Sequence, residues 1–330
     1  MHIEYNDIIS VENLLCAWKE FQTGKKYKSD VMEFSHNLMK NIFEIHEELK
    51  NKTYAHGPYQ YFRITDPKPR DIHKATVKDR LIHHAIYRIL YLEFDKKFIY
   101  DSYSCRDNKG THKALNRFRY FTRIVSHNYT KQCFVLKCDI RKFFASINHN
   151  ILFGILRKNI GDPDVIILIE KIVKSFNVNN KPKNGLPLGN LTSQLLVNIY
   201  MNEFDHFVKR ELKQKYYIRY ADDFAFFDSN KQELTLILTE IRKFLLENLK
   251  LEIHPDKIYV QSIYSGIDYL GWIHFPHCRI LRTQTKKRVI RNCHEKNVEN
   301  ETIQSYLGLL KHGNCHEIIR SIPILCYNHS

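Results

Sequence analysis

The feature that most constrains this chain is a pair of adjacent carboxylates, Asp222 and Asp223, set between two hydrophobic runs. Residues 216–220 before the pair and residues 224–227 after it are mostly aromatic or aliphatic. This pattern predicts two short strands joined by a tight turn that carries the acids. Because side chains alternate between the faces of a strand, two neighbouring acids can serve one site only at such a turn. The pair therefore indicates either a solvated Asp-Asp turn or a site for a cation that offsets the repulsion.

A third acid ends another predicted strand. Residues 133–139 form a hydrophobic run that closes on Asp139. Taken alone, Asp139 could be an ordinary strand-end residue, but beside the acid pair it makes a set of three carboxylates. Oxygen ligands of this kind suit Mg²⁺, with Mn²⁺ as an alternative. Two such ions roughly 3.5–4 Å apart can activate an attacking hydroxyl and stabilise the leaving oxygen in phosphoryl transfer.

The charge of the chain predicts a polyanionic partner. Its 330 residues include 51 Lys and Arg against 36 Asp and Glu, a net charge of +15 that is spread along the sequence. Basic surface releases condensed counterions when it binds nucleic acid. An anionic membrane is the competing partner, but no apolar run approaches the ~20 residues that span a bilayer. The N-terminus also lacks the features of a signal peptide, so we expect a cytoplasmic protein without a membrane partner.

The cysteines do not predict a disulfide framework or a zinc site. Eight cysteines contain no Cys-x-x-Cys pair, and a chain of this length does not need disulfides to build a core. The cysteines and histidines near residues 293–294 and 312–316 do not match the spacing of a four-ligand zinc set.

Hydrophobic periodicity predicts an α+β fold with helices packed on one face of a mainly antiparallel sheet. The predicted helices cover residues 1–52, 78–94, 114–125, 149–159, 163–176, 189–213, 231–248 and most of the tail from 285. The predicted strands cover residues 59–64, 133–139, 216–220, 224–227, 251–254 paired with 257–260, and 269–273. We expect His83 and His84 on the surface of their helix.

The order of these parts resembles the palm of reverse transcriptases over about residues 60–275. A strand with one Asp precedes a helix that starts with Gly and Ser, an Asp-Asp hairpin, a strand with Lys and a Leu-Gly strand. The resemblance implies a right-hand polymerase that uses Mg²⁺ and dNTPs to make cDNA on RNA. It implies an N-terminal helical extension (1–55), fingers (56–132), a palm with an antiparallel sheet (133–275, with a fingers-derived insertion around 150–185) and a short helical thumb (276–330).

Finer features resemble the reverse transcriptases of diversity-generating retroelements. Where many relatives have Gln-Gly-x-x-x-Ser-Pro, residues 188–194 have the sequence Leu-Gly-Asn-Leu-Thr-Ser-Gln. Residues 109–114, 198–205 and 306–314 continue the match. In those bacterial, archaeal or phage elements the enzyme copies a template-repeat RNA with errors at adenines and works with a small basic accessory variability protein. A retron-type, intron-derived or phage-defence reverse transcriptase and an inactive RNA-binding scaffold remain alternatives.

The resemblance assigns roles to individual residues. The expected catalytic and metal-binding residues are Asp139, Ile140, Asp222 and Asp223, with Lys257 as a general acid near the leaving pyrophosphate. The expected dNTP-binding residues are Lys68, Arg70, Phe144, Leu188, Gly189, Ser193 and Gln194. The expected template and primer residues are Arg106, Lys109, Tyr220, Tyr269, Gly271 and Trp272.

Two of these residues carry specific expectations. Phe144 would be the steric gate that excludes a 2′-OH, although its neighbour Phe143 is easily confused with it. Leu188 replaces a Gln whose amide contacts the nascent base pair in many relatives. Leucine has no hydrogen-bonding group, so we expect weaker discrimination by a factor of about 2–13, the equivalent of about 0.5–1.5 kcal/mol. Nothing in the sequence explains a bias toward adenine.

Overall fold

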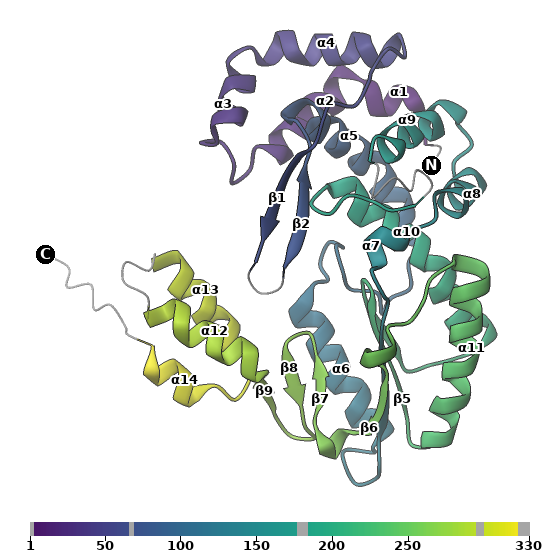
Figure 1. Ribbon diagram of the computed structural model, residues 1–330, viewed down its shortest axis with the longest axis vertical. Coiled ribbons are helices and arrows are strands. Elements are labelled where there is room, and N and C mark those ends of the chain that lie inside the picture. Colours follow the sequence, from purple (N-terminus) through teal and green to yellow (C-terminus); the bar gives the residue numbers. More distant parts are fainter. Residues whose placement is uncertain (1–2, 66–68, 177–183, 295–299, 323–330) are drawn as a thin grey trace, which may run out of the picture.

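The computed structural model of the chain describes residues 3–65, 69–176, 184–294 and 300–322. An N-terminal layer contains α1 (Tyr5–Ile9), α2 (Val11–Phe21), α3 (Ser29–His36) and α4 (Leu38–Lys50). A hairpin of β1 (Gln60–Ile64) and β2 (Arg70–Lys74) follows, and then α5 (Val77–Phe94), η1 (Asp95–Lys97) and α6 (Thr111–Val125). Figure 1 shows the N-terminal helices stacked over α5 and the hairpin extending away from that layer.

The central part of the chain alternates strands with helices. It contains β3 (Phe134–Asp139), α7 (Phe143–Ser146), α8 (His149–Asn159), α9 (Pro163–Lys174), α10 (Leu191–His206) and η2 (Phe207–Glu211). It continues with β4 (Tyr217–Tyr220), β5 (Asp223–Asp228), α11 (Lys231–Leu249), η3 (Pro255–Lys257), β6 (Tyr259–Ser262) and η4 (Ile263–Ser265). Strands β3 to β6 form an antiparallel sheet in the order β4-β5-β3-β6. The predicted α+β class is confirmed.

Helices cover both faces of this sheet, so the prediction of a single covered face is wrong. Leu136 and Phe226 belong to a core that includes the apolar side of α11, whereas Val135 and Phe227 pack against α6. The ring of Phe118 on α6 lies 4.8 Å from that of Phe227. The runs of consecutive apolar residues in β3 and β5 are the signature of strands that are buried on both faces.

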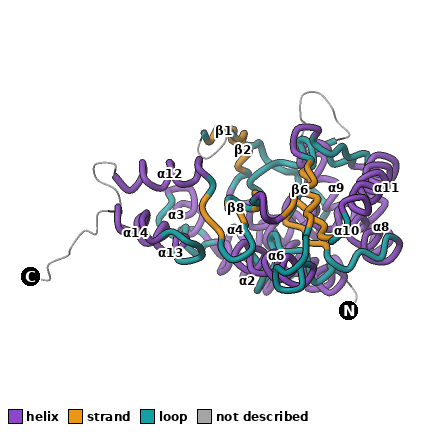
Figure 2. The backbone as a smooth tube through the Cα atoms, turned by 90° about the horizontal axis from the view of Figure 1, so that it is seen from below, coloured by secondary structure: helices purple, strands orange, loops and turns teal. Residues whose placement is uncertain are grey.

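The C-terminal part adds a smaller sheet and a helical tail. Strands β7 (Ile267–Tyr269), β8 (Trp272–His274) and β9 (Arg279–Leu281) are antiparallel, and α12 (Thr283–His294), α13 (Asn300–Leu310) and α14 (His316–Ser321) follow. Figure 2 shows these helices grouped at the end of the molecule opposite to α8 and α11. Their apolar residues share a core with α6 and the β7–β9 sheet.

Two predicted strands are wrong in detail. Residues 251–254 do not pair with residues 257–260; β6 pairs with β3 instead, and Ile253 makes only an isolated bridge to Ile140. Lys257 lies in the short 3-10 helix η3. The stretch 269–273 is not one strand but the turn between β7 and β8, in which Leu270 and Gly271 both have positive φ. The alternation of side chains along a strand does not reveal a two-residue turn. Such a turn is recognised from residues such as Asn-Gly, which this stretch lacks.

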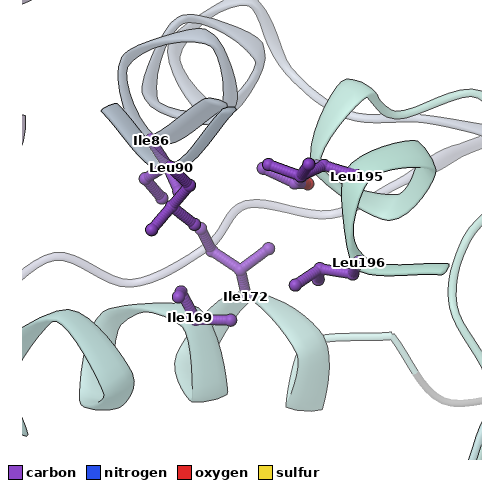
Figure 3. Close-up of a pocket in the computed structure, with 7 residues that line it drawn as sticks. Ile86, Leu90, Ile169, Ile172, Leu195 and Leu196 are labelled. Atoms are coloured by element: carbon purple, nitrogen blue, oxygen red, sulfur yellow. The ribbon is translucent and has the colours of Figure 1, made fainter. Parts of the chain in front are cut away.

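The helices α5, α9 and α10 enclose an apolar gap in the core. Figure 3 shows side chains that turn toward one another around it, contributed by Ile86, Leu90, Ile169, Ile172, Leu195 and Leu196. Thr192 supplies the remaining wall. This gap is a packing feature of the helical layer that supports α10, whose first turn faces the hairpin β1–β2.

His83 lies in this helical core, not on the surface, which corrects the prediction for that residue. It is 1% exposed, and within the described residues neither of its ring nitrogens makes a hydrogen bond. Burial lowers the pKa of His83 to about 3, with a smaller contribution from His56. Below about pH 6.5, His83 is therefore protonated in the unfolded chain but stays neutral in the folded protein. The free energy of unfolding falls as the pH falls through this range.

We predict that His83→Leu flattens the dependence of stability on pH. Between pH 7.5 and pH 5.5, His83 should account for a loss of about 1.4 kcal/mol in the free energy of unfolding. Urea denaturation of the wild type and the variant at both pH values measures the difference. His36→Leu removes an exposed histidine and should keep the wild-type dependence. An unchanged slope in His83→Leu would contradict the prediction.

Candidate active site

Strand pairing brings the three acids to one end of the central sheet. Asp139 is the last residue of β3 and lies directly opposite Asp223, the first residue of β5. Asp222 lies in the two-residue turn between β4 and β5, where Tyr220 pairs with Asp223. The predicted acid-bearing hairpin is confirmed, and Asp139 joins it across the neighbouring strand.

The turn that carries the acids has a strained backbone. Ala221 has φ +55°, a left-handed conformation that costs an L-residue about 1–2 kcal/mol. Two hydrogen bonds to main-chain carbonyls of the turn stabilise this conformation. The Ile140 amide donates to the Asp222 carbonyl (3.2 Å), and the Arg219 guanidinium donates to the Ala221 carbonyl (3.1 Å).

The carboxylates are crowded and partly withdrawn from water. Burial raises the pKa of Asp223 to about 7; Lys137 opposes this shift, whereas Asp222 and Asp139 add to it. Burial, and then the charge of Asp139, also raise the pKa of Asp222, whereas Lys257 and Arg70 lower it. The protein thus holds these groups together against their mutual repulsion.

Two lysines counter the negative charge. The Lys257 ammonium lies 2.7 Å from Asp139 Oδ1, and the Lys137 ammonium lies 3.1 Å from Asp223 Oδ1. The Lys137 side chain is only 9% exposed, whereas that of Lys257 is 41% exposed. Lys137 was not among the residues expected at the site. Its position two residues before Asp139 was the available signal, because it places both side chains on one face of β3.

The acids have the right chemistry for a hard divalent cation. Carboxylate oxygens are the ligands that Mg²⁺ and Mn²⁺ prefer, and a cation would stabilise the charged carboxylates that burial, and then the neighbouring acids, disfavour. Among the described residues, however, no three Asp, Glu, His or Cys side chains converge as a ready-made metal site. The Lys257 ammonium contacts Oδ1 of Asp139, so a cation bound at this carboxylate would lie next to a positive charge.

Strand β2 meets the residues that lead into α10, and Arg70 at its start is near enough to Asp222 to lower the pKa of that carboxyl. The amide of His73 in β2 donates to the Leu188 carbonyl (3.2 Å), and the Asn190 side chain donates to the His73 carbonyl (3.3 Å). Arg70 is exposed at the start of β2, whereas Lys68 lies outside the described residues. Gly189 has φ +104°, and its position is exposed.

The other predicted dNTP-binding residues differ in accessibility. Phe143 is buried in the core and Phe144 is half-buried, with the two rings 5.6 Å apart. A steric gate needs an accessible ring, so Phe144 is the better placed of the pair. Leu188 and Gln194 are half-buried, but Ser193 is only 2% exposed. Its side chain cannot contact a nucleotide directly.

The predicted primer residues Tyr269 and Trp272 need correction. They are 0% and 1% exposed, and Tyr269 stacks on Phe118 in the core beneath the β7–β8 hairpin. Their aromatic rings therefore belong to the core under the turn, whereas the half-buried backbone at Gly271 (φ +85°) has no side chain to prevent close approach of a ligand. Tyr220 is half-buried, with its hydroxyl 3.1 Å from that of Thr111.

The predicted template residues Arg106 and Lys109 also need correction. The Arg106 side chain is 6% exposed, forms an ion pair with Asp95 (2.6 Å) and donates to the carbonyls of Ile99 and Ser102. Its guanidinium is part of the scaffold. The Lys109 ammonium lies 3.5 Å from the centre of the Tyr100 ring and donates to the Tyr100 carbonyl. Sequence patterns cannot show that a basic loop folds back on its own backbone.

Comparison with known proteins identifies a family. The family model described as reverse transcriptase (RNA-dependent DNA polymerase) matches residues 65–274. This region contains the three acids, strand β2, the first turn of α10 and the β7–β8 turn.

Individual relatives are distant. The COX1/OXI3 intron 2 protein of Saccharomyces cerevisiae is 23% identical over 95% of this chain and 44% of its own length. The group II intron-encoded protein LtrA of Lactococcus lactis subsp. cremoris is 24% identical over 77% of this chain and 52% of its own length. The chain thus spans about half the length of these relatives.

The fold is also found among solved structures. The apo telomerase of Candida tropicalis superimposes with a TM-score of 0.53 at 13% identity, over 67% of this chain and 48% of the telomerase chain. This similarity concerns the fold alone, and it agrees with the predicted right-hand polymerase architecture. Among the helices that the structure describes, none is both long and apolar enough to cross a membrane.

We predict that Asp222→Asn stabilises the metal-free protein. The substitution removes one charge from a crowded, partly buried set, and relief of this kind at functional sites is typically worth about 0.5–2 kcal/mol. Urea denaturation at pH 8 with a chelator measures the free energy of unfolding. The control Asp256→Asn, at an exposed position, should stay within about 0.5 kcal/mol of wild type. A less stable Asp222→Asn protein would show that the crowding is not costly.

Proposed function

Because the chain belongs to the reverse transcriptase (RNA-dependent DNA polymerase) family, we propose that it makes DNA on an RNA template at the site formed by Asp139, Asp222 and Asp223. The observation that carries this proposal is the convergence of these acids at one end of the sheet, opposite the basic start of β2. We assign the fingers to residues 56–132, the palm to 133–275 and the thumb to 276–330.

The site residues divide the work of phosphoryl transfer. Two Mg²⁺ ions, when bound, supply charge neutralisation and activation of the primer hydroxyl; Asp139, Asp222 and Asp223 would hold them, with Ile140 contributing at the end of β3. Lys68 and Arg70 offset the charge of the triphosphate. Lys257 changes partner from Asp139 to the pyrophosphate, to which it can donate a proton.

The remaining contacts select and orient the nucleotide and the primer. Phe144 excludes a ribose 2′-OH from below the sugar. Leu188, Gly189 and Gln194 line the nascent base pair, and Ser193 supports them from within α10. Gly271 and Tyr220 approach the primer, with Tyr269 and Trp272 as the buried base of the turn.

We predict that Asp222→Asn combined with Asp223→Asn abolishes synthesis but keeps nucleic-acid binding. Primer extension on an RNA template with Mg²⁺ and dNTPs should fall by about 10³-fold or more, as when residues that act as one unit are removed. Binding to a labelled RNA–DNA duplex provides the control measurement. Synthesis at the wild-type rate would exclude this site. A wild type that binds but never synthesises would favour the RNA-binding scaffold.

We further propose that this is the mutagenic enzyme of a diversity-generating retroelement, acting on a template-repeat RNA with an accessory variability protein. The Leu-Gly-Asn-Leu-Thr-Ser-Gln sequence at residues 188–194 supports this proposal. So does the contact between two other matching motifs. The rings of His112 and His312 stack 3.6 Å apart.

A second candidate is an enzyme that copies RNA in a retron or group II intron setting. The similarity to the group II intron-encoded protein LtrA favours it. The two candidates differ in the errors that they leave in cDNA, and in whether a partner protein and a cognate RNA are needed for correct initiation.

We predict that wild-type cDNA carries errors concentrated at template adenines and that Leu188→Gln reduces total misincorporation by about 2–13-fold. The glutamine would restore a hydrogen bond to the nascent pair. Sequencing of cDNA made with and without candidate accessory protein measures both effects. The control Leu236→Gln changes a 63% exposed leucine on α11 and should leave errors unchanged. Faithful wild-type cDNA would favour the second candidate.

A further inference from the structure

Arg219 in β4 is the most deeply buried charged residue next to the acid-bearing turn. It and its partner Asp205 on α10 are both 0% exposed. The guanidinium makes a two-pronged contact, with Nε 2.8 Å from Asp205 Oδ1 and Nη2 2.6 Å from Oδ2. Tyr217 also donates to Asp205 Oδ1, at 2.8 Å.

The other donors of Arg219 reach three separate parts of the chain. Nη1 donates to Asn198 Oδ1 (3.2 Å) and to the Ala221 carbonyl (3.1 Å), and Nη2 donates to Ser102 Oγ (3.1 Å). All five N–H groups of the guanidinium are therefore used. Since the group is planar and rigid, these contacts leave it a single orientation.

In this orientation the guanidinium contacts the strained turn directly. Ala221 has the left-handed φ of +55°, and its carbonyl is the one that Arg219 contacts. Asn198 and Asp205 lie two helical turns apart on one side of α10, so the helix provides a fixed base for the guanidinium. Backbone bonds between Arg219 and residues Asp101 and Tyr103 add a second fixed base.

We propose that Arg219 is a positioning residue for the polymerase reaction: it holds the Ala221–Asp222 turn so that Asp222 and Asp223 are placed to bind cations beside Asp139. This inference rests on the proposed polymerase function. Residues 198–205 are one of the segments that resemble the enzymes of diversity-generating retroelements. The inference gives that segment a role, because it contains both Asn198 and Asp205.

The competing explanation is that Arg219 only stabilises the fold. Removing the charges of Arg219 and Asp205 together distinguishes this explanation from a positioning role. An apolar pair of similar volume can replace a buried ion pair without loss of stability, whereas removal of one partner leaves an uncompensated charge. The double variant Arg219→Met with Asp205→Leu therefore removes both buried charges together, and with them the donor to the Ala221 carbonyl. Arg219→Lys keeps the charge but lacks the fork needed to reach Asp205 and the turn together.

The test compares these variants with wild type in folding, metal binding and single-turnover primer extension. We expect the folded double variant to bind the primer–template duplex normally. Its extension rate should fall on the order of 10²-fold, as for a small misplacement of reacting groups. Its affinity for Mn²⁺, measured by electron paramagnetic resonance without nucleotide, should fall about 10-fold or more.

The control is Arg80→Met, which breaks an ion pair with Asp30 (2.6 Å) that involves no residue of the Arg219 network. It should leave Mn²⁺ affinity unchanged. If the double variant does not fold, Arg219→Lys decides by the same two measurements. A folded variant with wild-type Mn²⁺ affinity and extension rate would overturn the inference. Failure of the proposed function is distinguishable, because the wild type itself would then make no DNA.

Discussion

The structure depends on holding three carboxylates at one end of a sheet against their repulsion. Asp139 and Asp223 face each other in strand register, and Asp222 follows in a turn that adopts a left-handed backbone. Each carboxylate oxygen withdrawn from water is costly unless a positive charge or a donor compensates it. Lys137 beside Asp223 and Lys257 beside Asp139 provide this compensation.

The two-sided burial of the sheet gives the site its rigidity. With α11 on one face and α6 on the other, β3 and β5 cannot shift register without exposing an entire row of apolar side chains. The positions of Asp139 and Asp223 are thus set by the packing of residues that never contact a substrate. The Arg219 network adds a polar anchor to the hairpin at the same place.

Local sequence predicted the parts of the site that follow from strand alternation and turn chemistry. It placed Asp139 at a strand end and the acid pair in a turn, and the structure agrees. It failed for side chains whose partners are distant in the chain. Arg106 forms an ion pair with Asp95. Tyr269 and Trp272 are buried in the core that includes α6 and the C-terminal helices. No short pattern distinguishes a free basic or aromatic side chain from one that packs on the protein itself.

The sequence by itself determined the α+β class, the acid-bearing hairpin and the family to which the chain belongs, because these depend on local periodicity and on an ordered set of motifs. Only the tertiary structure decided that both faces of the sheet are covered, that Lys137 lies against Asp223, and that Asp205 and Asn198 on α10 hold the guanidinium of Arg219 in β4. Such contacts join residues up to 117 positions apart, as between Arg219 and Ser102. They arise from long-range packing, which short-range patterns do not encode.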